Sequence, residues 1–443
     1  MGRENIEKYS NKYALLKYVA GLWHNNVYYR RVIVLGRQNI NPEHHLIFAP
    51  NHQNALMDAL AVLFTNKGQN VFLARADIFK KKTIASLLYF LKILPVYRIR
   101  DGFSTLKGND EIFDKTIDVI KHKNGLVVLP EGDHQGFRRL RQLKKGICRI
   151  AFQADEASDF NLKIKIIPVG LEFTNYNRVR QVLTVVYGKP IEVSEFHELY
   201  KKSPEIALNE LRSKLSSEIK KLIVHIESEE DYEAIDELRS MVNGRYSDDI
   251  KFPKLFRDRI LIEKLNRLKI SDLPLYSKIC SLSLQVKQKA KTLNIDYRLL
   301  AKKKHPLGWL IAGMTGIIIS FPLFIYGGIF TLTFNALPQI KVRKIKDIQF
   351  QSSVRYGISL VLSFIFFPLY LALSLILFSP WWLAFLVVLS LPVAGLFAWN
   401  YPFMYSRIKG GFRIRNFIKC NNMEYKELKK DYDELLNIIK NLK

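Results

Sequence analysis

The sequence predicts an α/β fold in which a mostly parallel sheet is flanked by helices, followed by a helical insert and C-terminal membrane helices. Two patterns support this prediction. Short apolar runs that end at polar turns alternate with helical patterns, as strands and helices do around a buried parallel sheet. Further on, three uncharged apolar runs are too long to be helices of a soluble domain. A chain of 443 residues with 48% apolar content has room for two or three domains and a substantial core.

The predicted strands are mainly apolar runs, and the last two are read as apolar throughout, as buried parallel strands tend to be. They are RVIVLG at 31–36, LIFAP at 46–50, VFLARADIF at 71–79, GLVVLP at 125–130, IKIIPVGLEF at 164–173 and VLTVVYGKPIEV at 182–193. Each of the central runs ends at a polar or glycine-containing turn. We therefore expect a sheet whose carboxyl edge carries the polar residues.

The turn after the strand at 46–50 carries one histidine, then two amides (Gln53 and Asn54) and a carboxylate, and Asn51 precedes the histidine. A neutral imidazole oriented by a carboxylate can remove a proton from a hydroxyl near pH 7. His52 and Asp58, with five residues between them, are therefore candidates for a general base and its partner. A histidine and an aspartate this close also occur by chance in solvated turns, so these two residues alone leave both interpretations open.

Charged residues at two further places suggest anion binding. Arg98 and Arg100 share one face of an extended segment, and could present two guanidinium groups to a phosphate or form a solvated strand edge. Glu131 and Gly132 end the strand at 125–130, where glycine lets the backbone approach a ligand. A basic run follows them, and it either binds an anion or forms a solvated face: Arg138, Arg139, Arg141, Lys144 and Lys145.

Four blocks in this order resemble the glycerophospholipid acyltransferase family of the PlsC type, which includes glycerol-3-phosphate and lysophosphatidic acid acyltransferases. They are Asn51-His52…Asp58, Pro95-Val96-Tyr97-Arg98, Leu129-Pro130-Glu131-Gly132 and Ile167-Pro168-Val169-Gly170. The resemblance covers roughly residues 30–195 and implies an acyltransferase fold and a catalytic domain at 31–200. Because each block lies at a strand end, the set is more specific than any one block.

The resemblance implies that His52 is the base, Asp58 its partner and Arg98 a phosphate ligand. It also places Glu131 and Gly132 in the acceptor site, and Pro168 and Val169 near the acyl donor. We assign further residues to substrate binding, namely Asn51, Arg100, Arg138 and Arg139.

The chain departs from the family pattern at two points. The common spacing has four residues between the histidine and the aspartate, whereas five stand here, which resembles the glycerol-3-phosphate/dihydroxyacetone-phosphate branch. The common Pro-Glu-Gly-Thr-Arg is replaced by Pro-Glu-Gly-Asp-His, so His134 stands where an arginine is expected. Arg138 or Arg139 could take the place of that arginine.

The N-terminal segment 1–30 has an apolar stripe at helical spacing, formed by Tyr13, Leu16, Ala20, Trp23 and Val27. Such a stripe packs on a core or lies on a membrane with tryptophan at the interface. Because basic and aromatic residues are mixed here, we favour a membrane-docking helix.

The C-terminal half divides into a helical insert at 201–305, a membrane region at 306–405 and a basic tail with a helix at 406–443. The runs 357–378 and 381–403 are each close to the ~20 residues that a membrane span needs. Three basic clusters flank the apolar runs at 302–304, 341–346 and 407–415, and all should face the cytosol. This requires the first run, 307–337, to be a hairpin bent near Pro322.

The net charge of +27, from 68 Lys and Arg against 41 Asp and Glu, implies an anionic partner such as nucleic acid, an acidic lipid surface or a phosphorylated substrate. Together with the apolar runs and the resemblance, it favours a bilayer with anionic lipids and a phosphorylated glycerol acceptor, and no nucleic acid. Three distant cysteines give no metal-ligand spacing, and we expect no cofactor besides acyl-CoA or acyl-carrier protein as the thioester donor and co-substrate.

The sequence therefore predicts a multi-pass membrane O-acyltransferase of phospholipid synthesis, acting on glycerol-3-phosphate or 1-acylglycerol-3-phosphate. Its catalytic domain is expected on the cytosolic side, at the cytoplasmic membrane in a bacterium. Two alternatives are an acyltransferase for another lysolipid or an acylated amino acid, and a non-catalytic adaptor that binds anionic lipid.

Overall fold

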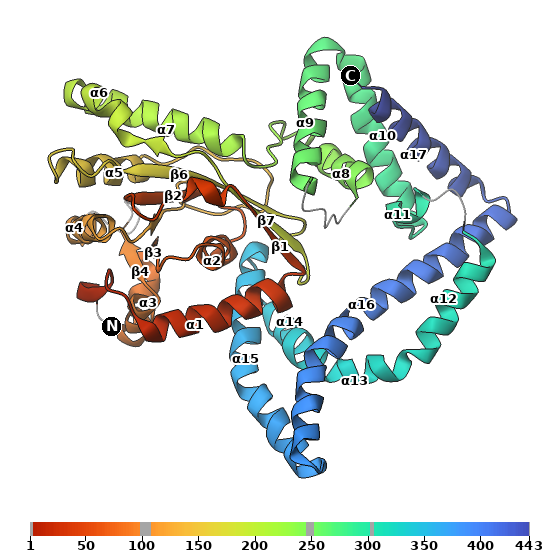
Figure 1. Ribbon diagram of the computed structural model, residues 1–443. Helices are drawn as coiled ribbons and strands as arrows, with labels where there is room; N and C mark the ends of the chain where they lie inside the picture. Colours follow the sequence, from red (N-terminus) through yellow and green to blue (C-terminus); the bar gives the residue numbers. More distant parts are fainter. Residues whose placement is uncertain (1–2, 98–107, 245–251, 302–304, 443) are drawn as a thin grey trace. The chain divides into compact units, whose positions relative to one another are not determined.

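The computed structural model describes residues 3–97, 108–244, 252–301 and 305–442 (Figure 1). The chain forms two compact units. The first contains Met1–His225 together with a separate segment, Asp347–Ser353, and the second contains Ile226–Lys346 and Val354–Lys443. The first unit holds the sheet, and the second is helical in its described part.

The sheet has the strand order β1-β7-β6-β2-β5-β3-β4, with β8 pairing to β6. The strands are β1 (Arg31–Leu35), β2 (Leu46–Pro50), β3 (Val71–Arg75), β4 (Ile93–Val96), β5 (Leu126–Val127), β6 (Lys165–Phe173), β7 (Val182–Tyr187) and β8 (Ile191–Glu192). All neighbours are parallel except β6 with β7 and β6 with β8. The predicted mostly parallel sheet is therefore confirmed.

The run 182–193, expected as one parallel strand, instead forms β7 and β8, which both run antiparallel to β6. Only the short loop 174–181 joins β6 to β7. A loop of this length can join antiparallel neighbours, whereas a parallel pair needs a crossover of a dozen or more residues.

Helices cover both faces of the sheet in the first unit (Figure 1). One face carries α4 (Gly108–Lys121), α5 (Gly146–Glu156) and α7 (Pro204–Lys220), and the other carries α1 (Asn11–Leu22) and α2 (Leu56–Thr65). The remaining helices of this unit are α3 (Lys82–Phe90) and α6 (His197–Lys202), with short 3-10 or π turns at Arg3–Asn5, Trp23–Tyr28, Arg37–Asn39, Ala76–Phe79 and Val193–Phe196.

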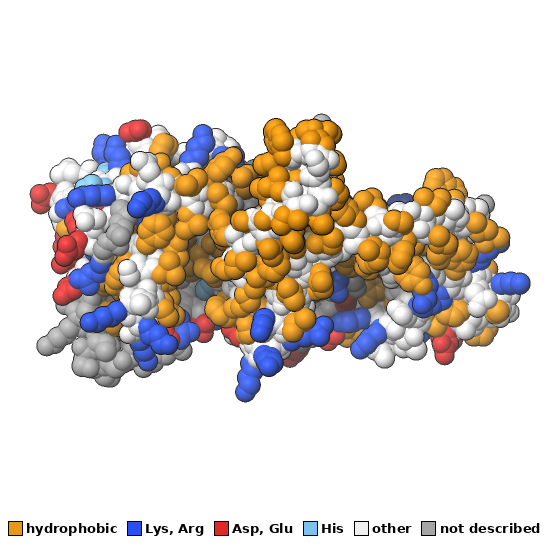
Figure 2. All heavy atoms as spheres, turned by 90° about the horizontal axis from the view of Figure 1, so that it is seen from below, with side chains coloured by type: hydrophobic (Ala, Val, Ile, Leu, Met, Phe, Trp, Pro, Cys, Tyr) orange, Lys and Arg blue, Asp and Glu red, His pale blue; other side chains and the backbone are white. Residues whose placement is uncertain are grey.

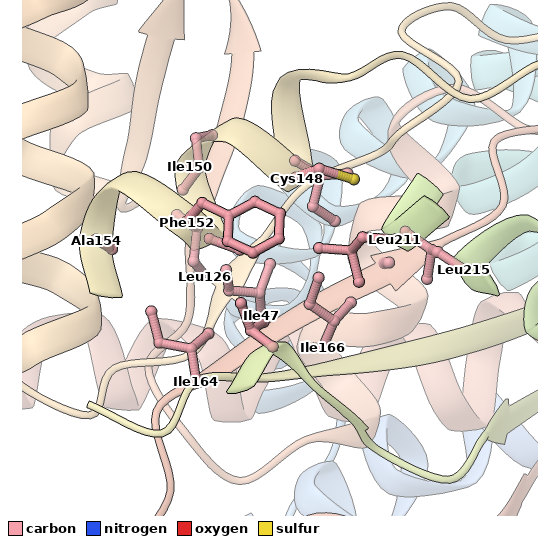
Figure 3. Close-up of a cluster of buried hydrophobic side chains, with 14 of the residues drawn as sticks. Ile47, Leu126, Cys148, Ile150, Phe152, Ala154, Ile164, Ile166, Leu211 and Leu215 are labelled. Atoms are coloured by element: carbon pink, nitrogen blue, oxygen red, sulfur yellow. The ribbon is translucent and has the colours of Figure 1, made fainter. Parts of the chain in front are cut away.

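The core of the first unit lies between the sheet and α5 and α7 (Figure 3). Ile47 and Leu126 of neighbouring strands meet Phe152 of α5, and all three are fully buried. Leu211 and Leu215 of α7 belong to the same cluster. The helix at 204–220, predicted as the start of a helical insert, is therefore part of the first unit, because its apolar face is needed to cover the sheet.

The apolar stripe predicted to dock α1 on a membrane faces the protein instead. Tyr13 is 2% exposed, and its ring contacts Phe90 edge-on, with the ring centroids 6.4 Å apart. A second stripe, Leu15, Tyr18 and Leu22, lies outward with exposures of 67%, 66% and 47%. The membrane interpretation was therefore wrong for the stripe that contains Tyr13. The helix α1 has two apolar faces, and the sheet domain covers the face with Tyr13.

The second unit contains α8 (Tyr232–Asn243), α9 (Lys254–Ser271), α10 (Leu273–Thr292), α11 (Tyr297–Leu300) and α17 (Met423–Asn441). The C-terminal helix α17 packs on α10, so the predicted tail and insert form one bundle. A buried ionic group holds α8 to α9. Asp258 of α9 accepts hydrogen bonds from Arg239 of α8 at 2.5 Å and from Lys254 of α9 at 2.7 Å.

The apolar helices of this unit are α12 (Leu307–Ile319), α13 (Phe321–Thr331), α14 (Leu337–Val342), α15 (Ile348–Leu377), whose first residues belong to the first unit, and α16 (Trp381–Lys419), with a π turn at Leu332–Ala336. Among the described residues, three helical stretches are long and apolar enough to cross a membrane: Phe321–Val342, Ile348–Leu377 and Trp381–Lys419. In the most apolar stretch of α15 only 11% of the residues are buried inside the protein. Hydrophobic side chains accordingly gather on the surface of these helices (Figure 2).

The run 307–337 breaks beside Pro322, as predicted, but it does not form a hairpin. Ser320 ends α12, and Pro322 lies in the first turn of α13. Both helices instead pack along α16 in succession, and Tyr401 donates to Ile317 O while Tyr326 donates to Val387 O. Each half therefore has α16 as its partner rather than the other half.

Two adjacent glycines on α13 allow this packing to be tested. A Cβ at Gly327 would overlap the carbonyl group of Ala394 on α16, whereas a Cβ at Gly328 would meet nothing within 4 Å. We expect Gly327→Ala to push α13 from α16 and to lower the thermal midpoint in detergent, by about 1–3 kcal/mol of stability. Gly328→Ala is the matched control and should leave the midpoint unchanged or raise it slightly. Equal midpoints for the two variants would argue against this helix contact.

Candidate active site

The polar residues of the site gather at the carboxyl ends of β2 and β5, which are parallel neighbours in the sheet. The chain leaves β2 at Pro50 and reaches His52 two residues later, and it leaves β5 at Val127 and reaches Glu131 four residues later. Because both strands end at the same edge, the two turns meet there. His52 N donates to Glu131 Oε1 at 2.6 Å.

The predicted contact between His52 and Asp58 is present. His52 Nδ1 lies 2.9 Å from Asp58 Oδ2, the Asp58 side chain is fully buried and the His52 side chain is 15% exposed. A carboxylate at Nδ1 favours the tautomer with its proton on that nitrogen. Nε2 is then the nitrogen that can accept a proton from a substrate.

The turn absorbs its extra residue by bending sharply around the carboxylate. Asp58 Oδ2 also accepts from Gln53 N at 2.8 Å and Asn54 N at 2.6 Å. Ala55 has a φ of 48°, a backbone conformation that favours glycine and costs roughly 1–3 kcal/mol for other residues. The five-residue spacing is therefore compatible with the histidine–aspartate contact, at the expense of one strained residue.

Glu131 connects the catalytic turn to an arginine. Its Oε2 accepts from Arg141 N at 3.1 Å and from Arg141 Nε at 3.2 Å. Burial raises the pKa of Glu131 above its usual value, although the bonds from His52 N and from Arg141 favour the charged form. The guanidinium is thereby held next to the turn that carries His52.

Three buried polar atoms of this site have no hydrogen-bond partner within the described part of the chain: Gln53 Nε2, Asp58 Oδ1 and Arg141 Nη2. An unsatisfied buried polar group costs about 1–3 kcal/mol, so it marks a place where water or a ligand binds. The Arg141 guanidinium thus keeps one buried nitrogen without a hydrogen-bond partner among the described residues.

Arg138 has buried protein partners, and its predicted part in substrate binding stays a prediction. It is 4% exposed, and its Nε donates to Glu172 Oε1 at 2.8 Å while its Nη2 donates to Phe173 O at 2.7 Å. Its guanidinium also lies over the ring of Tyr176, 5.0 Å from the ring centroid. These partners on and just beyond β6 hold Arg138 in a structural role.

Asn51, Pro168 and Val169 are also structural in this arrangement. The Asn51 side chain is fully buried and bonds both backbone groups of Leu171, at 2.6 and 3.1 Å. Pro168 and Val169 pair with Ala49 and Pro50 of β2 and are buried within the sheet. These contacts join β2 to β6, and the assignment of the three residues to substrate binding stays a prediction.

The other assigned residues have different outcomes. Arg98 and Arg100 lie outside the described residues. Gly132 is exposed, with a φ of 74°, in the turn directly after Glu131. Arg139 is half-buried, two residues before Arg141, and its role stays a prediction.

His134, at the position where the family pattern has arginine, lies beside His52 with the ring centroids 5.4 Å apart. Its Nε2 is 2.8 Å from Asp347 Oδ2. Burial of Asp347 opposes ionisation, but the bond from His134 and the amides of Phe350 and Gln349 hold the pKa of Asp347 below its usual value. The segment 347–353 therefore reaches the site from the start of α15.

The sequence interpretation missed Arg141 and the segment 347–353 as parts of the site. Arg141 was only one member of a basic run, and nothing in that run distinguishes it from its neighbours. Asp347 precedes an apolar helix, which is a helix-start signal, but this signal does not say what else the carboxylate binds.

The arrangement can take a proton from a hydroxyl group of an anionic molecule. Nε2 of His52 is placed to accept a proton, and the positively charged guanidinium of Arg141 lies next to the turn that carries His52. The described residues contain no group of three His, Cys, Asp or Glu side chains that could hold a metal ion.

His52, Asp58, Glu131 and Arg141 lie in a stretch that matches a known family model. Residues 31–172 match the family model described as Acyltransferase. Glycerol-3-phosphate O-acyltransferase 2 of Saccharomyces cerevisiae is 30% identical over 112 residues, 25% of this chain and 15% of that protein. Glycerol-3-phosphate O-acyltransferase 1 of the same yeast is 25% identical over 171 residues, 37% of this chain and 21% of that protein. The matches thus span about a fifth or less of these relatives.

The solved structure of the 1-acyl-sn-glycerophosphate (LPA) acyltransferase PlsC from Thermotoga maritima is similar at 19% sequence identity and a TM-score of 0.32. That similarity covers 47% of this chain and 81% of the Thermotoga chain.

The structural role of Arg138 can be tested by its effect on stability. Arg138→Ala leaves Glu172 buried without its ionic partner, so we expect a loss of about 3–5 kcal/mol and a clear fall in the thermal midpoint. Arg149→Ala is the control, because Arg149 is an exposed arginine whose ion pair with Glu205 spans 4.0 Å. If Arg138→Ala leaves the thermal midpoint unchanged but raises the acceptor KM, Arg138 binds substrate rather than stabilising the fold.

Proposed function

Residues 31–172 match the family model described as Acyltransferase, and from this match we propose that the chain moves a fatty acyl group from a thioester donor to the hydroxyl of a phosphorylated glycerol. The observation that carries this proposal is the contact of His52 with Asp58 next to the Glu131–Arg141 pair. A base alone would suit many reactions. A base beside a free guanidinium nitrogen suits a hydroxyl substrate that carries negative charge.

The reaction proceeds in one addition and one elimination. Nε2 of His52 takes the hydroxyl proton as the glycerol oxygen bonds to the thioester carbon, and the charge on the imidazolium is balanced by Asp58. The tetrahedral intermediate then breaks its carbon–sulfur bond, and the imidazolium returns the proton to the departing thiolate. No acyl-enzyme is needed, because holding both substrates together supplies much of the rate.

Arg141 is proposed as the ligand of the acceptor's phosphate. Glu131 accepts from Nε and fixes the plane of the guanidinium, which leaves Nη2 for a phosphate oxygen. Arginine suits this task because its planar group can make two parallel bonds to a phosphate. Arg141 thus takes the place of the arginine that the family pattern has at position 134.

The acceptor is glycerol-3-phosphate or 1-acylglycerol-3-phosphate, and the donor is acyl-CoA or an acyl-carrier protein. Glycerol-3-phosphate is supported by the names of the two yeast relatives and by the longer histidine–aspartate spacing. The formed His52–Asp58 contact favours catalysis over an adaptor that only binds lipid. No resident cofactor takes part in the proposed mechanism.

The enzyme is proposed to work at a membrane, with the catalytic unit on the cytosolic side. The three long apolar helical stretches support membrane insertion. The outward stripe of Leu15, Tyr18 and Leu22 on α1 supports a second contact of the catalytic unit with lipid. The basic residues between 341 and 346, directly before the segment Asp347–Ser353 of the first unit, favour the cytosolic side for that unit and binding of anionic lipids.

The main test is His52→Ala in purified protein, with one labelled acyl donor and a panel of glycerol-phosphate, lysophospholipid and acyl-amino-acid acceptors. Loss of the base should lower kcat by about 10²–10⁴-fold without affecting expression or membrane association. Asp58→Asn should remove much of the activity as well. His122→Ala, at an exposed histidine of the same domain, is the control. Turnover close to that of the wild type in His52→Ala would refute the mechanism.

The role of Arg141 predicts a selective effect on one substrate. Arg141→Lys keeps the charge but loses the planar fork, so the acceptor KM should rise by about tenfold or more while the donor KM stays the same. Arg149→Lys serves as the surface control. If both KM values rise together, Arg141 supports the fold rather than the acceptor.

A further inference from the structure

The segment Asp347–Ser353 contacts the catalytic turn at two places, although nearly 300 residues separate the two in sequence. It packs with the first unit rather than with the unit that surrounds it in sequence. It also lies outside residues 31–172, the part that matches the acyltransferase family. Its contacts are therefore a feature of this chain beyond the shared domain.

The first contact is at the start of α2, the helix that carries Asp58. Ala55 precedes this helix and has no side-chain group that could cap it. The first N–H group, on Leu56, donates instead to Ser353 Oγ at 3.1 Å. A serine from a distant segment thus does the work that a capping residue normally does from within the turn.

Ser352 holds the residue on the other side of Ala55. Its Oγ donates to Asn54 Oδ1 at 2.7 Å, and its backbone O accepts from Tyr28 OH at 2.9 Å. Asn54 N is one of the donors to Asp58 Oδ2. Both serines are almost fully buried, at 1% and 3% exposure. The two residues that flank the strained Ala55 are therefore both bonded to this segment.

The second contact is with the loop after Glu131. Asp347 Oδ1 accepts from Gln349 N at 3.0 Å and Phe350 N at 3.2 Å and so caps α15, while its Oδ2 binds His134. Gly136 lies so close to Gln349 that a Cβ there would overlap its side chain. The segment thus joins the two turns whose residues form the site.

We propose that Ser352 and Ser353 are positioning residues of the acyltransferase: they hold the turn between His52 and Asp58 in the geometry in which Asp58 orients the imidazole. This inference rests on the proposed function for its catalytic part. Both serines act through the backbone and Asn54, and neither touches the reacting atoms. Removal of either should therefore lower kcat and leave the KM of both substrates unchanged.

The test uses Ser353→Ala and Ser352→Ala in the full chain, with Ser363→Ala as the matched control. Ser363 lies on the same helix and is largely buried, and its hydroxyl donates within that helix to Leu360 O at 2.6 Å. Hydrogen exchange of a peptide that covers residues 53–57 is measured without substrate, beside kcat and both KM values. We expect about threefold to thirtyfold faster exchange in Ser353→Ala, as for loss of a helix cap, and a fall of kcat by a similar factor. In Ser363→Ala neither quantity should change.

Unchanged exchange in both serine variants would overturn the proposal, and so would a loss of activity that appears in KM rather than in kcat. If Ser353→Ala does not fold, Ser352→Ala carries the same test through Asn54. Because exchange is read without substrate, wild-type protein that transfers no acyl group would refute the proposed function, while the exchange rates would still decide whether the segment holds the turn.

Discussion

The site depends on the carboxylate oxygen Asp58 Oδ2, which accepts from His52 Nδ1 and from the backbone N–H groups of Gln53 and Asn54. These three donors wrap the turn around one buried acceptor. The position of the imidazole and the path of the backbone are consequently determined together. The turn accommodates its extra residue because Asp58 Oδ2 also accepts hydrogen bonds from the next two residues after His52, Gln53 and Asn54.

Two arginines of the basic run after Glu131 differ in how completely the protein satisfies their hydrogen-bonding groups. Arg138 and Arg141 are three residues apart, and each faces a buried glutamate. Arg138 also has a carbonyl group and a tyrosine ring as partners, whereas Arg141 keeps one nitrogen without a partner in the described structure. The two arginines therefore differ in the number of their buried partners, and neither residue type nor charge distinguishes them.

Much of the fold and part of the site could be predicted from sequence, because they depend on local pattern. The apolar run at 46–50, the polar turn and the helix after it led to the contact of His52 with Asp58. Where one sequence pattern is compatible with two packing arrangements, the sequence alone could not distinguish between them. The helix α1 has apolar residues on two faces, and only the packed structure shows that Tyr13 lies inward and Tyr18 outward. Likewise Pro322 marked a break, but only the structure identifies α16 as the partner of both halves.

The contacts of Ser352 and Ser353 could not be read from the sequence, because a helix cap is ordinarily sought beside the helix. Ala55 offers no capping group, and the N–H of Leu56 would otherwise lack an acceptor in a largely buried turn. A domain cut after residue 225 would contain every block of the family resemblance but would lack the group that completes this turn. The first unit is therefore discontinuous in sequence. Its last element is the beginning of α15, an apolar helix whose remainder belongs to the second unit.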